Sequence, residues 1–351
     1  AWIAWDHPNM PWDGTELWLA DIAADGSLAG ARCIAGGRDE AIFQPEWSPD
    51  GILHFVSDRT GWWNLYRWAG DGIGPQAVRM MPAEFGQAFW QFGMSTYGFV
   101  GARTIVAAWA EEGVWRLGRL DTDTAELERF GLPFADYYCV KAAGGRAAVQ
   151  ATGDAEPAAV VVVDATSGRY EVLRRSATFD IDPGYVSAAE PVSFPTAGGE
   201  TAHGFLYMPA NRDFAAPPGE LPPLIVKGHG GPTSQARPGF SLKIQYWTSR
   251  GFAFLDVNYR GSTGFGTAYR RRLDRSWGVA DVEDCIAGAR WLAEQGRVDG
   301  ERLIITGGSA GGYTVLAALA FHDVFRAGAS HYGIGDLMAL ADDTHKFESR
   351  Y

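Results

Sequence analysis

The hydrophobic pattern of the chain changes near residue 180, and this change restricts the fold more than any other feature of the sequence. Before it, short apolar stretches alternate with a period of two and are separated by Gly, Asp, Pro and Asn, as in strands and turns. After residues 176–205, apolar strands alternate with segments of helical spacing, which is typical of βαβ units and a mainly parallel sheet. We therefore predict an all-β domain at residues 1–180 and an α/β domain at residues 181–351.

The all-β half carries a degenerate repeat. Related strand starts recur near Trp2, Leu53, Ile105 and Ala147, at a spacing of roughly 40 to 50 residues, the length of one four-stranded propeller blade. This repeat predicts a partial β-propeller. A two-sheet sandwich is the structural alternative, because irregular blades and sandwich strands look alike in a single sequence. The chain opens without Met inside a predicted strand, so we expect a fragment.

Strands and helices can be assigned along the α/β half from their apolar periods. The expected strands are residues 224–227, 252–258, 303–306 and 327–331, and helical spacing is found at residues 241–250, 280–295 and 312–321. Asp281 and Glu283 fall in the first turn of the second of these helices, where negative charge interacts favourably with the helix dipole.

Charge and composition exclude several classes of partner. The formal net charge of −12 and an isoelectric point near 5.0 argue against nucleic acid and anionic membranes. No apolar run approaches the roughly 18 residues that span a bilayer and no signal segment opens the chain, so we expect a cytoplasmic protein. Cys33, Cys139 and Cys285 lie far apart without metal or disulfide spacing, and we expect buried, reduced thiols. The glycines of residues 260–266 match no nucleotide-binding pattern, so no cofactor is expected.

The stretch LIITGGSAGGYTVLA at residues 303–317 contains a G-x-S-x-G motif around Ser309. Alone the motif is weak, but here it follows a buried-type strand and opens a helix, which is the setting of a nucleophile elbow. Gly307, Gly311 and Gly312 permit a sharp turn and close packing of the helix on the strand. We predict that Ser309 is a catalytic nucleophile held in a strained conformation; the alternative is an inert serine in a glycine-rich turn.

A second glycine-rich turn, in VKGHGGPTS at residues 226–234, follows an earlier strand of the same domain. Acyl transfer requires donors aimed at the oxyanion that develops during attack, and such a turn offers free backbone N–H groups. We assign the N–H groups of Gly231 and Ala310 as the oxyanion donors. The alternative is an ordinary turn in which His229 only packs.

Five stretches, KGHGGPTS, DVNYRGSTGFG, WGVADVEDC, GGSAGG and DTHKFESRY, occur in this order. They resemble the prolyl oligopeptidase family of serine peptidases, in the branch of acylaminoacyl peptidases and dipeptidyl aminopeptidase-like enzymes. PEWSPDG and SDRTGWWNLY resemble that branch's propeller, so the resemblance covers essentially the whole chain. It implies a β-propeller followed by an α/β-hydrolase domain, here partial at both ends.

The chain departs from part of this family at one position. In prolyl oligopeptidase itself and in the dipeptidyl peptidases, a tyrosine hydroxyl from the turn corresponding to residues 228–230 is an oxyanion donor. This sequence has His229 there. The departure favours a backbone donor and places the chain nearer the acylaminoacyl peptidases.

The acid and base of a catalytic triad should follow Ser309 in the order Asp or Glu, then His, on loops after later strands. His322 and Asp323 end the helix that Ser309 starts, roughly 20 Å away at 1.5 Å per residue. His331 lies on or just past the next strand, and no further strand and helix units follow. We therefore expect the triad Asp and His beyond Tyr351. An acidic segment near the end is expected to be solvated, with a metal site as the weaker alternative; its candidate ligands are Asp342, Asp343, His345 and Glu348.

Three further residues are candidates for substrate binding. Tyr332 and Ile334 follow the strand next to the nucleophile, where they could line a specificity pocket or belong to the core. Glu84 lies in a long segment between strands of the β half, and we assign it to a substrate's free amine, because a carboxylate discriminates against capped substrates. A solvated blade-loop acid is the alternative for Glu84. Other acids considered in this half are Asp6, Asp13, Glu40 and Glu46.

The sequence supports three hypotheses about function. The first is a serine peptidase that cleaves a short peptide near its N-terminus and releases one residue, a dipeptide or an acylated residue. The second is an esterase or amidase of the same fold, acting on a non-peptide ester or an aminoacyl amide. The third is a propeller-based binding module with an inactive hydrolase domain. The oligomeric state is left open, and a homo-oligomer fits any of them.

Overall fold

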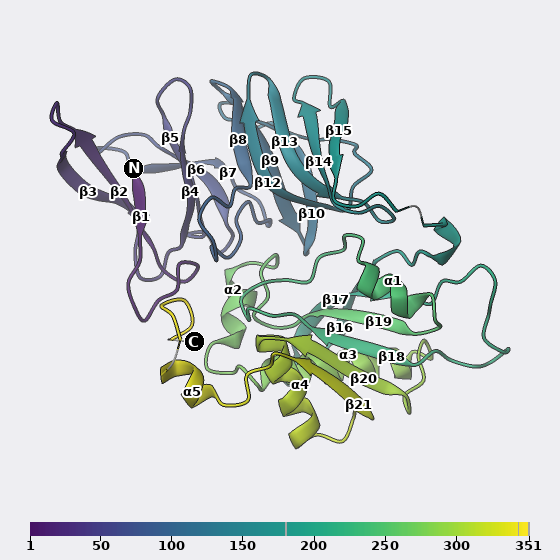
Figure 1. Ribbon diagram of the computed structural model, residues 1–351. Helices are drawn as coiled ribbons and strands as arrows, with labels where there is room; N and C mark the ends of the chain where they lie inside the picture. The colour runs from purple at the N-terminus through teal and green to yellow at the C-terminus, as the bar shows by residue number, and fades with distance from the viewer. Residues whose placement is uncertain (180, 343, 350–351) are drawn as a thin grey trace.

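The computed structural model describes residues 1–179, 181–342 and 344–349. Its first half consists of antiparallel sheets that follow one another along the chain (Figure 1). The first is three-stranded, with β1 (Trp2–Ala4), β2 (Glu16–Ile22) and β3 (Leu28–Gly36). Three four-stranded sheets follow. The first of them has β4 (Ile42–Trp47), β5 (Leu53–Ser57), β6 (Asn64–Trp68) and β7 (Pro75–Arg79). The next has β8 (Tyr97–Gly101), β9 (Thr104–Glu111), β10 (Val114–Asp121) and β11 (Leu127–Arg129), and the last has β12 (Asp136–Ala143), β13 (Arg146–Thr152), β14 (Ala159–Asp164) and β15 (Tyr170–Arg175).

Each of these sheets pairs its strands in sequence order, as in a propeller blade. The predicted starts at Leu53, Ile105 and Ala147 all fall on the second strand of a four-stranded sheet, and Trp2 falls on the first strand of the three-stranded sheet, so the repeat is confirmed. Between neighbouring sheets the core is rich in large aromatic side chains, among them Trp63 and Trp109. Burying such side chains removes much apolar surface from water and stabilises the packing of one sheet on the next.

The second half is built on one six-stranded sheet with the order β16-β17-β19-β18-β20-β21 (Figure 1). Its strands are β16 (Glu190–Pro195), β17 (Thr201–Tyr207), β18 (Leu224–Gly228), β19 (Ala253–Asn258), β20 (Leu303–Gly308) and β21 (Ala327–His331). The four strands predicted from the sequence are confirmed, and they run parallel to one another. The antiparallel hairpin of β16 and β17 was not predicted, because β16 carries prolines, which weaken a strand pattern.

Five α-helices accompany this sheet in the described residues: α1 (Leu242–Thr248), α2 (Thr267–Arg270), α3 (Ala280–Glu294), α4 (Ala310–Phe321) and α5 (Leu337–Asp342). The three predicted helices correspond to α1, α3 and α4. Helices α3 and α4 pack on each other and on the parallel strands, with buried Cys285 and Leu292 of α3 in the shared core. Asp281 and Glu283 lie in the first turn of α3, as predicted. None of the helices in the described ranges is long and apolar enough to cross a membrane.

Ion pairs connect the β-sheets of the first half to the α/β half. Asp58 pairs with Arg270 at 2.7 Å, and Arg237 pairs with Asp136 at 2.7 Å. The change from one architecture to the other falls between the end of β15 at Arg175 and the start of β16 at Glu190. The boundary near residue 180 stays a prediction, and residue 180 lies outside the described residues.

The cysteines differ in part from the expectation. All three are free, but only Cys285 is buried; Cys139 is partly exposed and Cys33 is exposed on β3. The prediction of three buried thiols was wrong for Cys33 because β3 lies in the first sheet, where most of its residues face solvent.

Candidate active site

Ser309 lies at the turn between β20 and α4. Its φ of 54° and ψ of −122° put a non-glycine residue in a conformation that L side chains rarely adopt. The backbone N–H of Ser309 donates to the carbonyl of His331 at 3.1 Å, which ties the turn to the neighbouring strand. The predicted setting of strand, strained serine and helix is confirmed; the role of Ser309 as nucleophile stays a prediction.

The glycines around Ser309 are required by close backbone contacts. A Cβ on Gly311 would lie 2.2 Å from the carbonyl oxygen of Gly228, and one on Gly307 would lie 2.3 Å from the carbonyl oxygen of Gly311. Such distances are far inside van der Waals contact, so no other residue fits at either position without a shift of the backbone. The start of α4 therefore packs directly against the end of β18.

The glycine turn after β18, residues 229–231, packs against the elbow around Ser309. A Cβ on Gly230 would be 3.2 Å from the carbonyl oxygen of Gly308 and 3.6 Å from the Cβ of Ser309. Gly231 has a φ of 131°, which favours glycine. Within the described part of the chain, the backbone N–H groups of Gly231 and Ala310 donate to no acceptor. The turn packs on Ser309 and α4 begins at the next residue, so two free donors lie in the segments beside Ser309, as an oxyanion site needs.

His229 does not face Ser309. Its imidazole is buried between β18 and the segment after β19, where Nε2 lies 2.7 Å from the Oγ of Ser262 and Nδ1 lies 2.8 Å from the carbonyl oxygen of Gly230. Burial lowers the pKa of His229 to about 3, so the ring is neutral. Both ring nitrogens are engaged, and His229 is therefore not available as the base.

The other histidines near the elbow are also not paired with Ser309. His322 caps the far end of α4, and His331 ends β21 with an exposed side chain. His345 lies 3.9 Å from Glu348 in the segment after α5. Among the described residues, no side chain forms a hydrogen bond with the Oγ of Ser309. The triad acid and base stay predictions.

The segment at residues 342–348 was also considered as a metal site. Asp343, one of the four candidate ligands, lies outside the described residues. In the ranges that the structure describes, no three side chains of His, Cys, Asp or Glu gather closely enough to hold a metal ion.

Tyr332 lies beside the elbow. Its ring is so close to Gly308 that a Cβ there would lie 3.0 Å from the tyrosine oxygen, and 85% of Tyr332 is exposed. The alternative that Tyr332 belongs to the core is therefore wrong, and its ring is available to line a pocket next to Ser309. Ile334 is half-buried. Its role in substrate binding stays a prediction.

Glu84 faces the α/β half, but its carboxylate is not open to a substrate. The side chain is fully buried, and its two oxygens accept hydrogen bonds from the backbone N–H groups of Gly264 at 2.8 Å and Gly266 at 3.1 Å. A substrate ammonium could reach Glu84 only if these bonds were broken. The assignment of Glu84 to the substrate amine is corrected accordingly: it holds the loop after β19 against the β-sheets.

The structure also brings residues to the site that were not singled out from the sequence. Trp90 of the β half donates from its indole Nε1 to the carbonyl of Thr233 at 2.8 Å, directly after the glycine turn. Tyr259 and Ser262 contact His229 from the loop after β19. The available signal for these two residues was their presence in the DVNYRGSTGFG stretch, which carried the family resemblance without a physical role.

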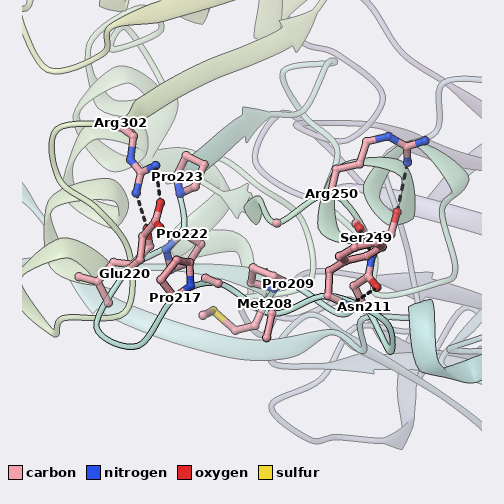
Figure 2. A pocket seen from close by; sticks show the side chains of 15 residues that line it. Met208, Pro209, Asn211, Pro217, Glu220, Pro222, Pro223, Ser249, Arg250 and Arg302 are labelled. Atoms are coloured by element: carbon pink, nitrogen blue, oxygen red, sulfur yellow. Dashed lines mark hydrogen bonds and ion pairs between the residues drawn. The ribbon is translucent and has the colours of Figure 1, made fainter.

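A separate cavity of about 850 Å³ lies where the parallel strands begin, at the edge opposite Ser309. Figure 2 shows that Pro222, Pro223 and Arg302, which precede β18 and β20, come together there with the loop from Met208 to Leu221. Active sites of parallel α/β sheets lie at the carboxyl ends of the strands. Ser309 and the glycine turn are at that end, so this cavity is not the candidate active site.

The α/β half is similar in sequence to a known protein family. The sequence model described as the prolyl oligopeptidase family matches residues 238–351, which include the loop after β19 and the elbow. Residues 238–351 are thus similar to this family. Four of the five stretches that carried the resemblance, from DVNYRGSTGFG onward, lie within these residues, so the resemblance is confirmed.

Known proteins are similar to longer parts of the chain. The solved structure of a Mycobacterium tuberculosis puromycin-hydrolyzing peptidase is 42% identical, with a TM-score of 0.96, and the match covers 100% of this chain and 54% of that chain. A crystal structure of puromycin hydrolase is 41% identical, with a TM-score of 0.95, over 100% of this chain and 53% of that chain. Dipeptidyl aminopeptidase BIII of Pseudoxanthomonas mexicana is 34% identical over 156 residues, which are 43% of this chain and 22% of that protein.

The fold is shared more widely. Prolyl oligopeptidase B from Galerina marginata has a TM-score of 0.77 at 18% identity, over 95% of this chain and 46% of that chain. The antiparallel sheets are therefore blades of a β-propeller, and the six-stranded sheet is that of an α/β-hydrolase domain. The chain spans about half the length of the two puromycin-hydrolysing proteins, 53% and 54%.

Proposed function

We propose that the protein is a serine hydrolase of amide bonds that acts on short peptides near their N-terminus. The observation that carries this proposal is the strained Ser309 at the end of β20, packed against the glycine turn of residues 229–231. A serine held in this way is exposed to substrate while neighbouring N–H groups remain free, and a structural turn needs neither feature.

In the proposed reaction, the Oγ of Ser309 attacks the scissile carbonyl carbon, and a histidine base takes the hydroxyl proton. The N–H groups of Gly231 and Ala310 stabilise the negative charge on the carbonyl oxygen. The C–N bond then breaks, the base returns the proton to the leaving amine, and water releases the acyl group from Ser309. We propose that the base and its carboxylate partner lie beyond Tyr351.

An amidase acting on aminoacyl amides is a second candidate, and one observation favours it. Solved structures that match the whole of this chain at 41% and 42% identity are described as puromycin-hydrolysing proteins. The bond chemistry is the same as for a peptide, because in both substrates an amine leaves an acyl group. What differs is the leaving group that the site has to accept.

The propeller supports a preference for small substrates. Trp90 reaches from the propeller to Thr233, next to the proposed oxyanion turn, and Tyr332 lies against Gly308 of the elbow. Tyr332 and Ile334 are proposed to contact the substrate. We propose that the propeller, held this close to the turn, admits short, unfolded chains in preference to folded proteins.

The first experiment is labelling of the full-length enzyme with a fluorophosphonate, with Ser309→Ala as the control. Labelling of the wild type but not of Ser309→Ala supports a competent nucleophile. Absence of labelling in both supports the third hypothesis, a binding module with an inactive hydrolase domain, and rejects the proposal.

The second experiment compares substrates. Free peptides, acyl-capped peptides, aminoacyl amides and simple esters are hydrolysed in parallel, and kcat/KM is measured for each. Preference for free or capped peptides supports the peptidase, whereas preference for aminoacyl amides or esters supports the second candidate. The cytoplasmic location and the two-domain division near residue 180 are part of the same proposal and await direct tests.

A further inference from the structure

Two side chains hold the carbonyl groups of the oxyanion turn, one from the turn itself and one from the loop after β19. The hydroxyl of Tyr259 donates to the carbonyl of His229 at 3.0 Å and lies 3.2 Å from the carbonyl oxygen of Pro232. The Nδ1 of His229 lies 2.8 Å from the carbonyl oxygen of Gly230. Tyr259 and His229 therefore hold the carbonyls of the two residues that precede Gly231, the proposed oxyanion donor.

Ser262 completes this arrangement from the other side of the ring. Its Oγ lies 2.7 Å from the Nε2 of His229, and its side chain is fully buried. The hydroxyl of Ser262 donates to the carbonyl of Tyr259 at 2.7 Å, so the same oxygen contacts both the ring of His229 and the backbone of residue 259. The serine thus fixes the orientation of the ring.

The ring is also fixed by stacking. The rings of His229 and Tyr259 have centroids 4.1 Å apart and planes 20° apart. The backbone N–H of Ser262 donates to the carbonyl of Tyr259 at 2.9 Å, so residues 259–262 form a compact turn of their own. The side chains of Tyr259 and Ser262 are both buried in this turn.

We propose that Ser262 is a positioning residue for the oxyanion turn, acting through His229, with Tyr259 as a second positioning residue. This inference rests on the proposed function. A turn with two successive glycines, Gly230 and Gly231, has wide backbone freedom, so its N–H groups need an external support to stay aimed at one point. The Ser262 hydroxyl and the Tyr259 hydroxyl supply that support without touching the substrate.

Loss of this support should act on the transition state. The oxyanion donors interact most strongly with the charge that develops during attack, so misplacing them lowers kcat and leaves KM nearly unchanged. A misplacement on the order of 1 Å costs up to about a hundredfold in rate. We expect Ser262→Ala to lower kcat by about tenfold to a hundredfold, and Tyr259→Phe, which removes only one oxygen, to do the same.

The test uses the full-length enzyme and four variants. Ser262→Ala and Tyr259→Phe remove the two hydroxyls, and Ser262→Thr keeps a hydroxyl at the first position. Ser193→Ala is the matched control, because Ser193 also bonds a histidine ring, with its Oγ 2.8 Å from the Nδ1 of His203, but on β16 away from the elbow. Kinetic constants are expressed per active site, counted by end-point labelling with a fluorophosphonate.

The inhibition constant of a peptide aldehyde distinguishes misplaced oxyanion donors from a simple loss of structure. The aldehyde forms a hemiacetal with Ser309 whose oxyanion occupies the same donors. We expect its inhibition constant to rise in proportion to the loss of kcat/KM in Ser262→Ala and Tyr259→Phe. Ser262→Thr should recover most of the activity, and Ser193→Ala should match the wild type.

Three results would overturn the inference while leaving the proposed function intact: unchanged kcat in both hydroxyl-free variants, a rise in KM at constant kcat, or fewer labelled sites with normal turnover per site. A wild-type enzyme that neither labels at Ser309 nor turns over any amide would instead reject the proposed function, and this inference with it.

Discussion

The carboxylate of Asp58 and the guanidinium of Arg270 form an ion pair of 2.7 Å across the two domains, with side chains only 1% and 2% exposed. Arg270 also donates to the carbonyl of Trp12 at 3.0 Å, and its guanidinium lies 4.2 Å from the ring centroid of Trp63. All three partners come from the propeller, whereas Arg270 belongs to α2. A charged residue of the hydrolase domain is therefore buried inside the neighbouring domain.

Removal of one partner of this pair should be strongly destabilising. Asp58→Ala leaves the Arg270 charge buried without its counter-ion, and we expect the free energy of unfolding to fall by about 3–5 kcal/mol. Denaturant unfolding followed by fluorescence measures the change. Asp39→Ala is the control, because Asp39 is 92% exposed and lies 4.0 Å from Arg271, so its loss should cost about 1 kcal/mol or less. Equal effects of the two substitutions would contradict the assigned importance of the buried pair.

Glu84→Ala should lower activity without regard to the charge of the substrate. The substitution leaves the N–H groups of Gly264 and Gly266 without their acceptor in a buried interface, at a cost of roughly 1–3 kcal/mol. Because the loop moves rather than an amine-binding site being lost, kcat/KM should fall by the same factor for free-amine and acyl-capped peptides. A loss confined to free-amine peptides would restore Glu84 as the amine-binding residue.

Gly311→Ala should abolish activity. The added Cβ would lie 2.2 Å from the carbonyl oxygen of Gly228, so the start of α4 has to move away from β18 and take Ser309 with it. We expect a loss of kcat/KM of about a hundredfold or more, since small displacements of reacting groups are costly. Gly335→Ala is the control, because a Cβ at Gly335 meets nothing within 4 Å. Normal kinetics for Gly311→Ala would show that the close contact between turn and helix is not needed.

Stability should decrease in acid because of two histidines. Burial lowers the pKa of His203 to about 4 and that of His229 to about 3. In the unfolded chain both titrate near pH 6.5, so below this pH the unfolded state binds protons that the folded state does not. The free energy of unfolding then falls as the pH drops from about 6.5 to about 4, by up to about 1.4 kcal/mol per pH unit for each histidine.

The acid effect can be isolated with His203→Phe, which removes one of the two groups away from the elbow. Urea midpoints of the wild type and the variant are measured at pH 6.5 and pH 4.5. The difference between the two midpoints should be smaller in the variant. An identical pH dependence would mean that His203 does not contribute to the loss of stability.

The fold could be predicted well where local pattern and burial agree. β18, β19 and β20 are short apolar runs at the centre of the sheet, and their residues are needed for the core regardless of what surrounds them. β16 could not be predicted in this way, because its pairing with β17 compensates for prolines that weaken the local pattern. β16 forms because it pairs with β17 in the folded sheet.

The candidate site likewise contains residues that could be predicted from the local sequence and residues that depend on long-range contacts. Ser309 and the glycines beside it were predictable because a strained serine and close backbone contacts leave a local sequence signature. Glu84 was expected to face the hydrolase domain, and it does, but its partners are two backbone N–H groups from residues about 180 positions away. Neither those partners nor the contact of Ser262 with His229 leaves a periodic signal in the sequence.

The bond from Trp90 to Thr233 joins the propeller to the residue that follows the oxyanion turn by two positions. Under the proposed function, a substrate too bulky for the space between the domains would have to separate them, and separation would break this bond. The turn that carries Gly231 would then lose one of its restraints. We therefore expect the size of a substrate to act twice, on whether it enters and on how fast it reacts.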